Sequence, residues 1–143
     1  MKSKAIIEIP EGSLEKIEIK DGVPKIDRIL TIPNPVAYGF IPDTLAEDGD
    51  ALDIFVISNK LLNTSDEVEV KIVGAFKCTD QGVIDNKLVA VMSNEKTDDL
   101  TILKNLAQIG DYLLNYKPGF VINGYINYNP DVYFWKKLER TKI

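Results

Sequence analysis

The sequence predicts a mainly β fold with flanking helices, an α+β arrangement, because the pattern of apolar residues changes along the chain. In the first two thirds, short segments rich in Val and Ile alternate with turn signals such as Pro10-Glu11-Gly12 and Asp21-Gly22. After Thr97, apolar residues recur every three or four positions, which is the spacing of one helix face. Several short strands bounded by turns are typical of a barrel or a sandwich.

The expected strands are residues 4–9, 14–19, 25–32, 53–58, 68–77 and 87–92. In the second of these segments, the alternation places Lys16 and Glu18 on one face. In the third segment, Arg28 shares a face with Ile26 and Leu30. Arg28 therefore either ends an apolar stripe at the surface or serves a functional site.

A helix near 97–116 is expected from the apolar spacing that follows the strands. Thr97 is placed to cap this helix, and Pro118-Gly119 ends it. A last strand is expected at 120–128, and Asn129-Pro130 predicts a short C-terminal helix to about residue 140. The apolar face of the long helix consists of Leu100, Leu103, Ala107, Gly110 and Leu114.

Length and charge limit the class of protein. The 143 residues are 45% hydrophobic and 27% charged, which is typical of one globular domain, 1–143. The 17 basic and 22 acidic residues give a net charge of −5, so no nucleic acid and no polybasic membrane contact is expected. No run of 18 apolar residues is present, which predicts no membrane span. The short apolar stretch at the N-terminus is not typical of a signal peptide, so a cytoplasmic location is expected.

Cysteine and histidine usage restricts the chemistry. Cys78 is the single cysteine of the sequence, and there is no histidine. These absences exclude an intramolecular disulfide, a thiolate or His-ligated zinc site, and any Ser-His or Cys-His nucleophile pair. An enzyme with this sequence must therefore work with carboxylates, Lys, Arg, Tyr or a hard metal ion.

The strongest local feature is an acidic loop between Phe40 and Phe55 that leads into an apolar strand. Carboxylates placed this closely repel one another, and a bound cation would offset the repulsion. A calcium EF-hand starting at Asp48 is excluded, because Leu52 stands at a ligand position and Asn59 stands where Glu is needed. A solvated acidic turn and a magnesium site both remain open. The acidic residues of the loop are Asp43, Glu47, Asp48, Asp50 and Asp53.

A second acidic pair, Asp80 and Asp85, precedes Lys87. Gly82 lies between the two carboxylates, so a hairpin loop is the ordinary interpretation of this segment. The pair alone is weak evidence for a functional site.

Taken together, these residues resemble the soluble family I inorganic pyrophosphatases. The most specific match is Asp48-Gly49-Asp50-Ala51-Leu52-Asp53, which follows the family signature D-x-D-P-x-D except that Ala51 replaces proline. A second departure is Gln81, where the family often has an acidic residue, and the ends are shorter than in many bacterial members. The other matches occur in the family's order over about residues 5–118 and are Glu8, Lys16, Glu18, Arg28, Tyr38, Asp80, Asp85, Lys87, Tyr116 and Lys117. Tyr38 falls in what corresponds to a tyrosine-glycine turn of the family.

The resemblance implies a small closed OB-like β-barrel that hydrolyses inorganic pyrophosphate to two phosphates by a metal-activated water, without a covalent intermediate. It implies several Mg²⁺ ions, with Mn²⁺ or Zn²⁺ as substitutes and Ca²⁺ as an inhibitor. It also implies a homo-oligomer. The implied metal-binding residues are Asp48, Asp53, Asp80 and Asp85, with Glu8 and Glu18 in an outer shell that acts partly through water.

The resemblance also assigns the catalytic and substrate-binding groups. Asp50 is implied as the base that takes a proton from the attacking water. Lys87 is implied either to orient Asp85 or to reach a phosphate. The implied phosphate-binding residues are Lys16, Arg28, Tyr38, Tyr116 and Lys117. Taken singly, each lysine is an ordinary solvated residue and each tyrosine a packing residue, and only their common order favours a site.

Two other functions remain open on the sequence alone. A non-enzymatic OB-like binding module is disfavoured by the negative charge and by the retained acidic residues. A degenerate homologue that binds cations without catalysis is favoured only by Ala51, Gln81 and the short ends. None of these departures removes an implied metal ligand or the implied base.

Overall fold

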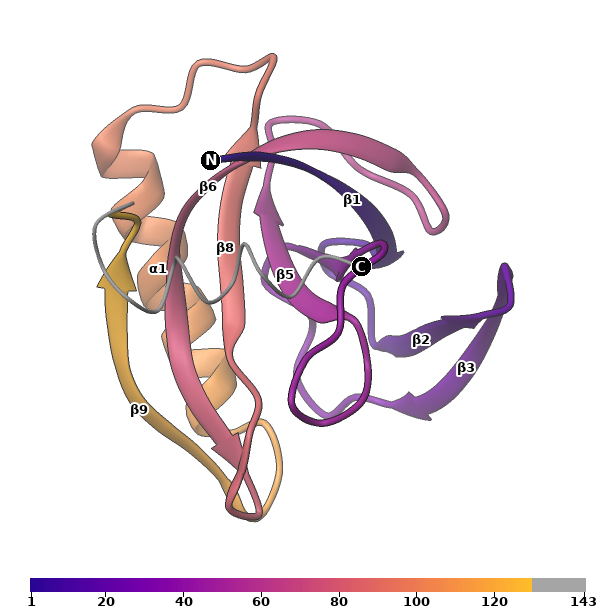
Figure 1. Cartoon of the computed structure of the whole chain (residues 1–143). Coiled ribbons are helices and arrows are strands. Elements are labelled where there is room, and N and C mark those ends of the chain that lie inside the picture. Colours follow the sequence, from indigo (N-terminus) through magenta and orange to yellow (C-terminus); the bar gives the residue numbers. More distant parts are fainter. Residues whose placement is uncertain (130–143) are drawn as a thin grey trace.

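The computed structural model describes residues 1–129, so the helix expected after Asn129-Pro130 lies outside the described residues. A closed ring of strands forms its centre (Figure 1). The ring consists of β1 (Lys2–Ile9), β4 (Ala37–Ile41), β5 (Leu52–Ile57), β8 (Lys87–Met92) and β6 (Glu67–Asp80), in that order. Pairing of β6 with β1 closes the ring. β5 and β8 are parallel, and the other ring neighbours are antiparallel.

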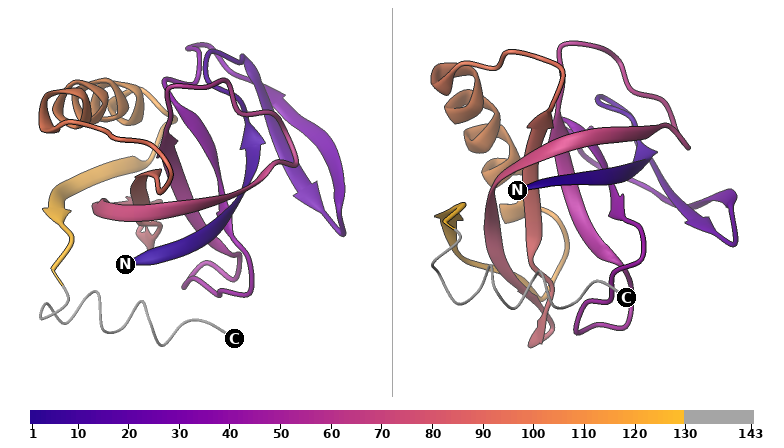
Figure 2. Two further views of the ribbon diagram at one scale, coloured as in Figure 1. Left: turned by 90° about the horizontal axis from the view of Figure 1, so that it is seen from above. Right: turned by 45° about the horizontal axis from the view of Figure 1, so that its top comes forward.

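The remaining elements surround the ring. β7 (Val83–Ile84) and β9 (Phe120–Asn127) pair with β6, while β2 (Glu15–Lys20) and β3 (Val23–Ile29) form a separate two-stranded hairpin. Figure 2 shows the helix α1 (Asp99–Leu114) and this hairpin at opposite sides of the ring. The predicted α+β class is confirmed, and the closed ring fits the expected OB-like fold. Within residues 1–129, no helix has both the length and the apolar character needed to cross a membrane.

Strand β5 is buried on both of its faces. Ile54 and Val56 belong to the apolar cluster inside the ring, together with Ile7 of β1. Phe55 belongs to the second cluster, which packs against Leu113 of α1. A strand covered on both sides needs apolar residues at successive positions, which explains the uninterrupted apolar run that follows the acidic loop.

The helix α1 begins one residue later than the sequence predicted. Asp98, and not Thr97, is the N-cap residue, and its Oδ1 accepts a hydrogen bond from the Thr101 backbone N–H at 2.7 Å. An ionised aspartate combines the capping hydrogen bond with a favourable interaction with the helix dipole, an advantage that a threonine lacks.

The apolar face that the spacing predicts for α1 does not pack on the ring. Leu100, Leu103 and Leu114 are 60%, 62% and 70% exposed. The side that packs on the ring instead includes the buried residues Ile109 and Leu113. The helix carries apolar residues on two stripes, and spacing alone does not say which stripe meets the sheet.

Two strand predictions also need correction. Residues Ala37–Ile41 were expected to contain a turn, but they form β4, whose Gly39 lies so close to β1 that a Cβ atom would stand 1.9 Å from the Ile6 carbonyl oxygen. In the hairpin, Ile26 is 57% exposed, so Arg28 does not continue an apolar core stripe. The hairpin therefore presents its side chains largely outside the core.

Replacing Ile54 by alanine tests the position of the core. Ile54 has no exposed surface, so Ile54→Ala should lower the free energy of unfolding by about 2–5 kcal/mol in urea denaturation. The matched control Ile26→Ala removes the same atoms from an exposed position and should change it by about 0.5 kcal/mol or less. Equal losses in the two variants would contradict the described packing.

Candidate metal centre

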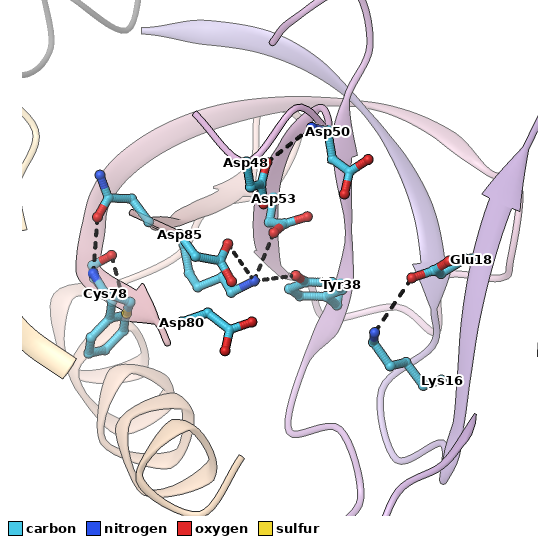
Figure 3. Close-up of polar contacts among 12 residues, drawn as sticks. Lys16, Glu18, Tyr38, Asp48, Asp50, Asp53, Cys78, Asp80 and Asp85 are labelled. Carbon is cyan, nitrogen blue, oxygen red and sulfur yellow. Dashed lines mark hydrogen bonds and ion pairs between the residues drawn. The ribbon is translucent and has the colours of Figure 1, made fainter. Parts of the chain in front are cut away.

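Three carboxylates meet at one end of the ring. Asp48, Asp53 and Asp85 each offer an oxygen, and these oxygens lie within 4.8 Å of one another (Figure 3). Asp53 stands on β5 opposite Lys87 of the parallel strand β8, and Asp85 precedes Lys87 by two residues. Two segments far apart in the sequence therefore deliver their carboxylates to the same end of neighbouring strands.

Lys87 is the cation at the centre of this group. Its Nζ lies 2.7 Å from Asp53 Oδ2 and 3.1 Å from Asp85 Oδ1, and it donates a hydrogen bond of 2.9 Å to the Tyr38 hydroxyl. The side chain is buried, with 3% of the residue exposed. Burial opposes the charge, but Tyr38 and the two carboxylates outweigh it, so the pKa of Lys87 is well above its ordinary value. Lys87 therefore remains an ammonium ion inside the protein.

Burial also acts on the acidic groups around Lys87. It raises the pKa of the Asp85 carboxyl, with Lys87 opposing and Asp53 adding to the shift. Burial likewise holds the pKa of Tyr38 well above its usual value, which keeps the phenol protonated at neutral pH. A divalent cation beside Asp85 would relieve the repulsion between the carboxylates, so the site is electrostatically suited to a metal ion.

The acidic loop is held in place by local hydrogen bonds. Asp48 Oδ1 accepts from the Asp50 backbone N–H at 3.0 Å, which folds the two carboxylates into one turn. The buried Thr44 hydroxyl donates to the Ile41 carbonyl at 2.6 Å and accepts from the Leu52 backbone N–H at 3.0 Å. Sequence reasoning missed Thr44, although a threonine inside an acidic turn is a recognisable anchor. Figure 3 shows Asp50 beside Asp48 and Asp53, and the Asp50 side chain is exposed.

Asp80 lies next to the cluster but is not one of its three members. Its Oδ2 pairs with Lys117 Nζ at 2.7 Å, and its Oδ1 is buried with no hydrogen-bond partner in the protein. An unpartnered buried oxygen is costly, and a cation or a water molecule would satisfy it. Asp80 and Lys117, both predicted from the sequence, are thus brought together as an ion pair.

Arg28 and Tyr116 line an open pocket of about 270 Å³ that also contacts Lys117. The Arg28 guanidinium lies 5.3 Å from the centroid of the Tyr116 ring, and its Nε is buried without a hydrogen-bond partner. Lys16 pairs with Asp27 at 3.1 Å. Burial opposes the charge of Lys16, but Tyr116 and Asp27 outweigh it and raise its pKa. These cations can bind the oxygens of a small anion beside the carboxylates.

Glu8 and Glu18 stand apart from the three-carboxylate group. Glu18 pairs at 3.6 Å with both Lys16 and Lys20. Glu8 Oε2 accepts a hydrogen bond from the Ile19 backbone N–H at 2.8 Å. Burial, together with the nearby charges of Asp53 and Glu18, raises the pKa of Glu8 to about 7. Within residues 1–129, neither glutamate joins the cluster directly.

Comparisons with known proteins find relatives of this chain. The family model described as inorganic pyrophosphatase matches residues 5–121. A curated inorganic pyrophosphatase of Sulfolobus acidocaldarius is 43% identical over 110 residues, which are 74% of this chain and 62% of that protein. One of Neisseria meningitidis is 34% identical over 140 residues, which are 95% of this chain and 74% of that protein. The matched part of the chain spans between 53% and 62% of the length of three curated relatives, including the Sulfolobus protein.

Solved structures give the same result. The crystal structure of an inorganic pyrophosphatase from Thermus thermophilus matches with a TM-score of 0.86 and 28% identity, covering 98% of this chain and 88% of that chain. The inorganic pyrophosphatase from Neisseria gonorrhoeae matches with a TM-score of 0.83 and 26% identity, covering 96% and 87%. The similarity therefore includes the whole ring and its flanking elements.

Removing the charge of Lys87 should destabilise the metal-free protein. Lys87→Met leaves two partly buried carboxylates without their cation, so the free energy of unfolding in chelator should fall by about 3–5 kcal/mol. Added Mg²⁺ should recover part of the loss, because it supplies positive charge to the same carboxylates. The control Lys77→Met changes an exposed lysine of β6 and should have little effect in urea denaturation. A loss that Mg²⁺ leaves unchanged would argue against a metal site here.

Proposed function

Because the chain belongs to the inorganic pyrophosphatase family, we propose that it is a Mg²⁺-dependent enzyme that hydrolyses inorganic pyrophosphate to two phosphates. The observation that carries this proposal is the meeting of Asp48, Asp53 and Asp85 within 4.8 Å, with the ammonium group of Lys87 paired to two of them. Arg28 and Lys87 both lie over the Tyr116 ring, at 5.3 and 5.8 Å from its centroid. Oxygen ligands without histidine or thiolate favour a hard cation such as Mg²⁺. The neighbouring cations suit the oxygens of a small, highly charged anion.

In this proposal Asp48, Asp53 and Asp85 hold the first metal ions, and Asp80 with Asp85 holds another near the substrate. The unpartnered Asp80 Oδ1 supports that role. Glu8 and Glu18 remain proposed as outer carboxylates. When bound, the ions lower the pKa of a water molecule and offset the negative charge of the phosphates.

Asp50 is the proposed general base. It accepts a proton from the attacking water, whose oxygen forms a bond to one phosphorus while the bridging P–O bond breaks and its electrons leave with the second phosphate. The position of the exposed Asp50 beside Asp48 supports this role. No side chain of the protein becomes covalently attached to phosphate.

The phosphates are proposed to be bound by the cations and phenols around the pocket. The unpaired Arg28 Nε supports a bidentate contact, which a planar guanidinium makes well. Lys117, whose Nζ lies 2.7 Å from Asp80 Oδ2, is also proposed to contact a phosphate. Lys87 is proposed to orient Asp53 and Asp85, because its ammonium group already contacts both carboxylates and the Tyr38 hydroxyl. Lys16, Tyr38 and Tyr116 complete the proposed set.

Mutation of the base gives the most direct test. Asp50→Asn keeps the size of the side chain and removes the proton acceptor, so turnover should fall at least about a hundredfold in a phosphate-release assay with Mg²⁺. Wild-type protein in chelator should be inactive. The matched control Asp43→Asn changes another exposed carboxylate of the same loop, at a positive φ of 60° that asparagine tolerates, and should keep its activity.

Two outcomes of this assay would change the assignment. Wild-type activity in Asp50→Asn would remove Asp50 from its role. No phosphate release by the wild type, with Mg²⁺ binding retained, would identify a cation-binding homologue without catalysis. Ca²⁺, which coordinates at longer and less regular distances, should bind and inhibit, while Mn²⁺ or Zn²⁺ should support turnover.

A cytoplasmic location, with neither nucleic acid nor membrane as a partner, also belongs to the proposal.

A homo-oligomer is also part of the proposal. The face of α1 that carries Leu100, Leu103 and Leu114 is apolar and exposed, and a second copy of the chain would cover it. This arrangement explains why the stripe is apolar although it does not contact the ring.

A charge on this helix face should shift the oligomer towards monomers. Leu103→Glu places a carboxylate in the proposed interface, and sedimentation velocity should detect smaller species than in the wild type. The control Leu61→Glu alters a leucine that is 66% exposed in a loop and should keep the wild-type assembly. A monomeric wild type would refute the proposed homo-oligomer.

A further inference from the structure

The β2–β3 hairpin is structurally separate from the ring. Its two strands pair with each other and form their own sheet, and Figure 1 shows them projecting beyond the ring strands. Val23, Ile26 and Ile29 are 51%, 57% and 64% exposed, so apolar burial does little to fix the orientation of β3. The half-buried residues of β2, such as Ile17 and Ile19, together with directed polar contacts therefore hold the hairpin in position.

The position of this hairpin matters for the site. β2 carries Lys16 and Glu18, and β3 carries Arg28, so three of the proposed site residues move with it. Lys16 and Arg28 lie opposite each other in the hairpin register, and Arg28 contacts the Tyr116 ring beyond α1. A small rotation of the hairpin would carry both cations away from a bound phosphate.

Hydrogen bonds at the base of the hairpin leave its outer part unsecured. The Leu30 N–H donates to the Leu14 carbonyl at 2.6 Å, and the Asn34 N–H donates to the Ser13 carbonyl at 3.0 Å. These bonds join the two chain segments where they leave the hairpin. They fix the base of the hairpin and do not reach its turn at Asp21.

Glu8 contacts the hairpin far from this base. It lies on ring strand β1, and its Oε2 accepts from the backbone N–H of Ile19, near the turn end of β2, at 2.8 Å. Ile19 stands opposite Pro24 in the hairpin register. The Ile19 N–H is directed at β1 and not at β3, so the side chain of Glu8 bridges the ring and the hairpin.

We infer that Glu8 is a positioning residue that holds the β2–β3 hairpin against the ring through the Ile19 N–H, and with it Lys16 and Arg28, two of the proposed phosphate-binding residues. The contact needs an acceptor oxygen and not a negative charge, because a neutral carboxyl or amide oxygen also accepts a backbone N–H. The bridge itself follows from the geometry, and only its consequence for substrate binding rests on the proposed function.

The test compares Glu8→Gln, which keeps an acceptor oxygen, with Glu8→Ala, which removes it. Amide hydrogen exchange of the metal-free full chain measures the hairpin directly and requires no activity. In Glu8→Ala, the backbone amides of β2 and β3 should exchange about tenfold faster than in the wild type, while those of β5 and β8 stay unchanged. Glu8→Gln should remain within about threefold of the wild type.

Kinetics with saturating Mg²⁺ form the second arm. Glu8→Ala should raise the KM for pyrophosphate about tenfold, with a smaller change in kcat, and Glu8→Gln should restore most of the lost affinity. The control Glu15→Ala removes an exposed glutamate from β2 itself and should match the wild type in both arms.

Each arm can overturn a different statement. Unchanged hairpin exchange in Glu8→Ala, or equally fast exchange in both Glu8 variants, would refute the positioning role. A wild type without pyrophosphatase activity would refute the proposed function, and the exchange data would still decide the role of Glu8.

Discussion

The ion pairs of one buried lysine hold the whole site together. Lys87 supplies the positive charge that allows Asp53, Asp85 and Tyr38 to lie side by side within a largely apolar structure. Without it, two partly buried carboxylates would repel each other at the end of the ring. The parallel pairing of β5 with β8 sets this contact, since it places Asp53 directly opposite Lys87. The position of Lys87 therefore brings the Asp53 and Asp85 carboxylates together.

Some residues of the site lie on the strands of the ring, and others lie on a loop and a hairpin connected to it. Asp53 and Lys87 belong to ring strands that are buried on both faces, so their backbones have little freedom. Asp48 lies on a loop anchored by the buried Thr44, and Arg28 lies on a hairpin outside the core. Asp53 and Lys87 are thus fixed by packing of the ring strands, whereas Asp48 depends on a hydrogen-bonded loop and Arg28 on a hairpin at the side of the ring.

Local sequence patterns predicted much of the candidate site but not its organisation. The acidic loop was recognisable because its carboxylates are close in sequence, and Asp48 and Asp53 do meet in space. The burial of Lys87 was not predictable, because its partners come from other strands and sequence spacing holds no information on which strands pair. A lysine that begins an apolar run is the one signal that could have suggested it.

The fold was predicted to a similar extent. The strands and the long helix were expected from their periodicities, whereas β4 was missed because Gly39 interrupts its apolar run. Gly39 is needed because β1 approaches it closely, and such a contact between distant segments cannot be predicted from local sequence patterns. The side of α1 that packs on the ring was not predictable for the same kind of reason, since Leu103 and Leu113 are equally apolar and only packing distinguishes them.

Closure of the ring also has a kinetic consequence. β1 pairs with both β4 and the first part of β6, and β8 fills the position between β5 and β6. The ring therefore cannot close on a ribosome until residue 92 has emerged, and until then β5 lacks its parallel neighbour. Contacts of such long sequence separation slow folding, because loop-closure entropy is lost before the pairing energy is gained. During synthesis, the nascent chain has to keep the apolar strand β5 from pairing with other chains until β8 is available.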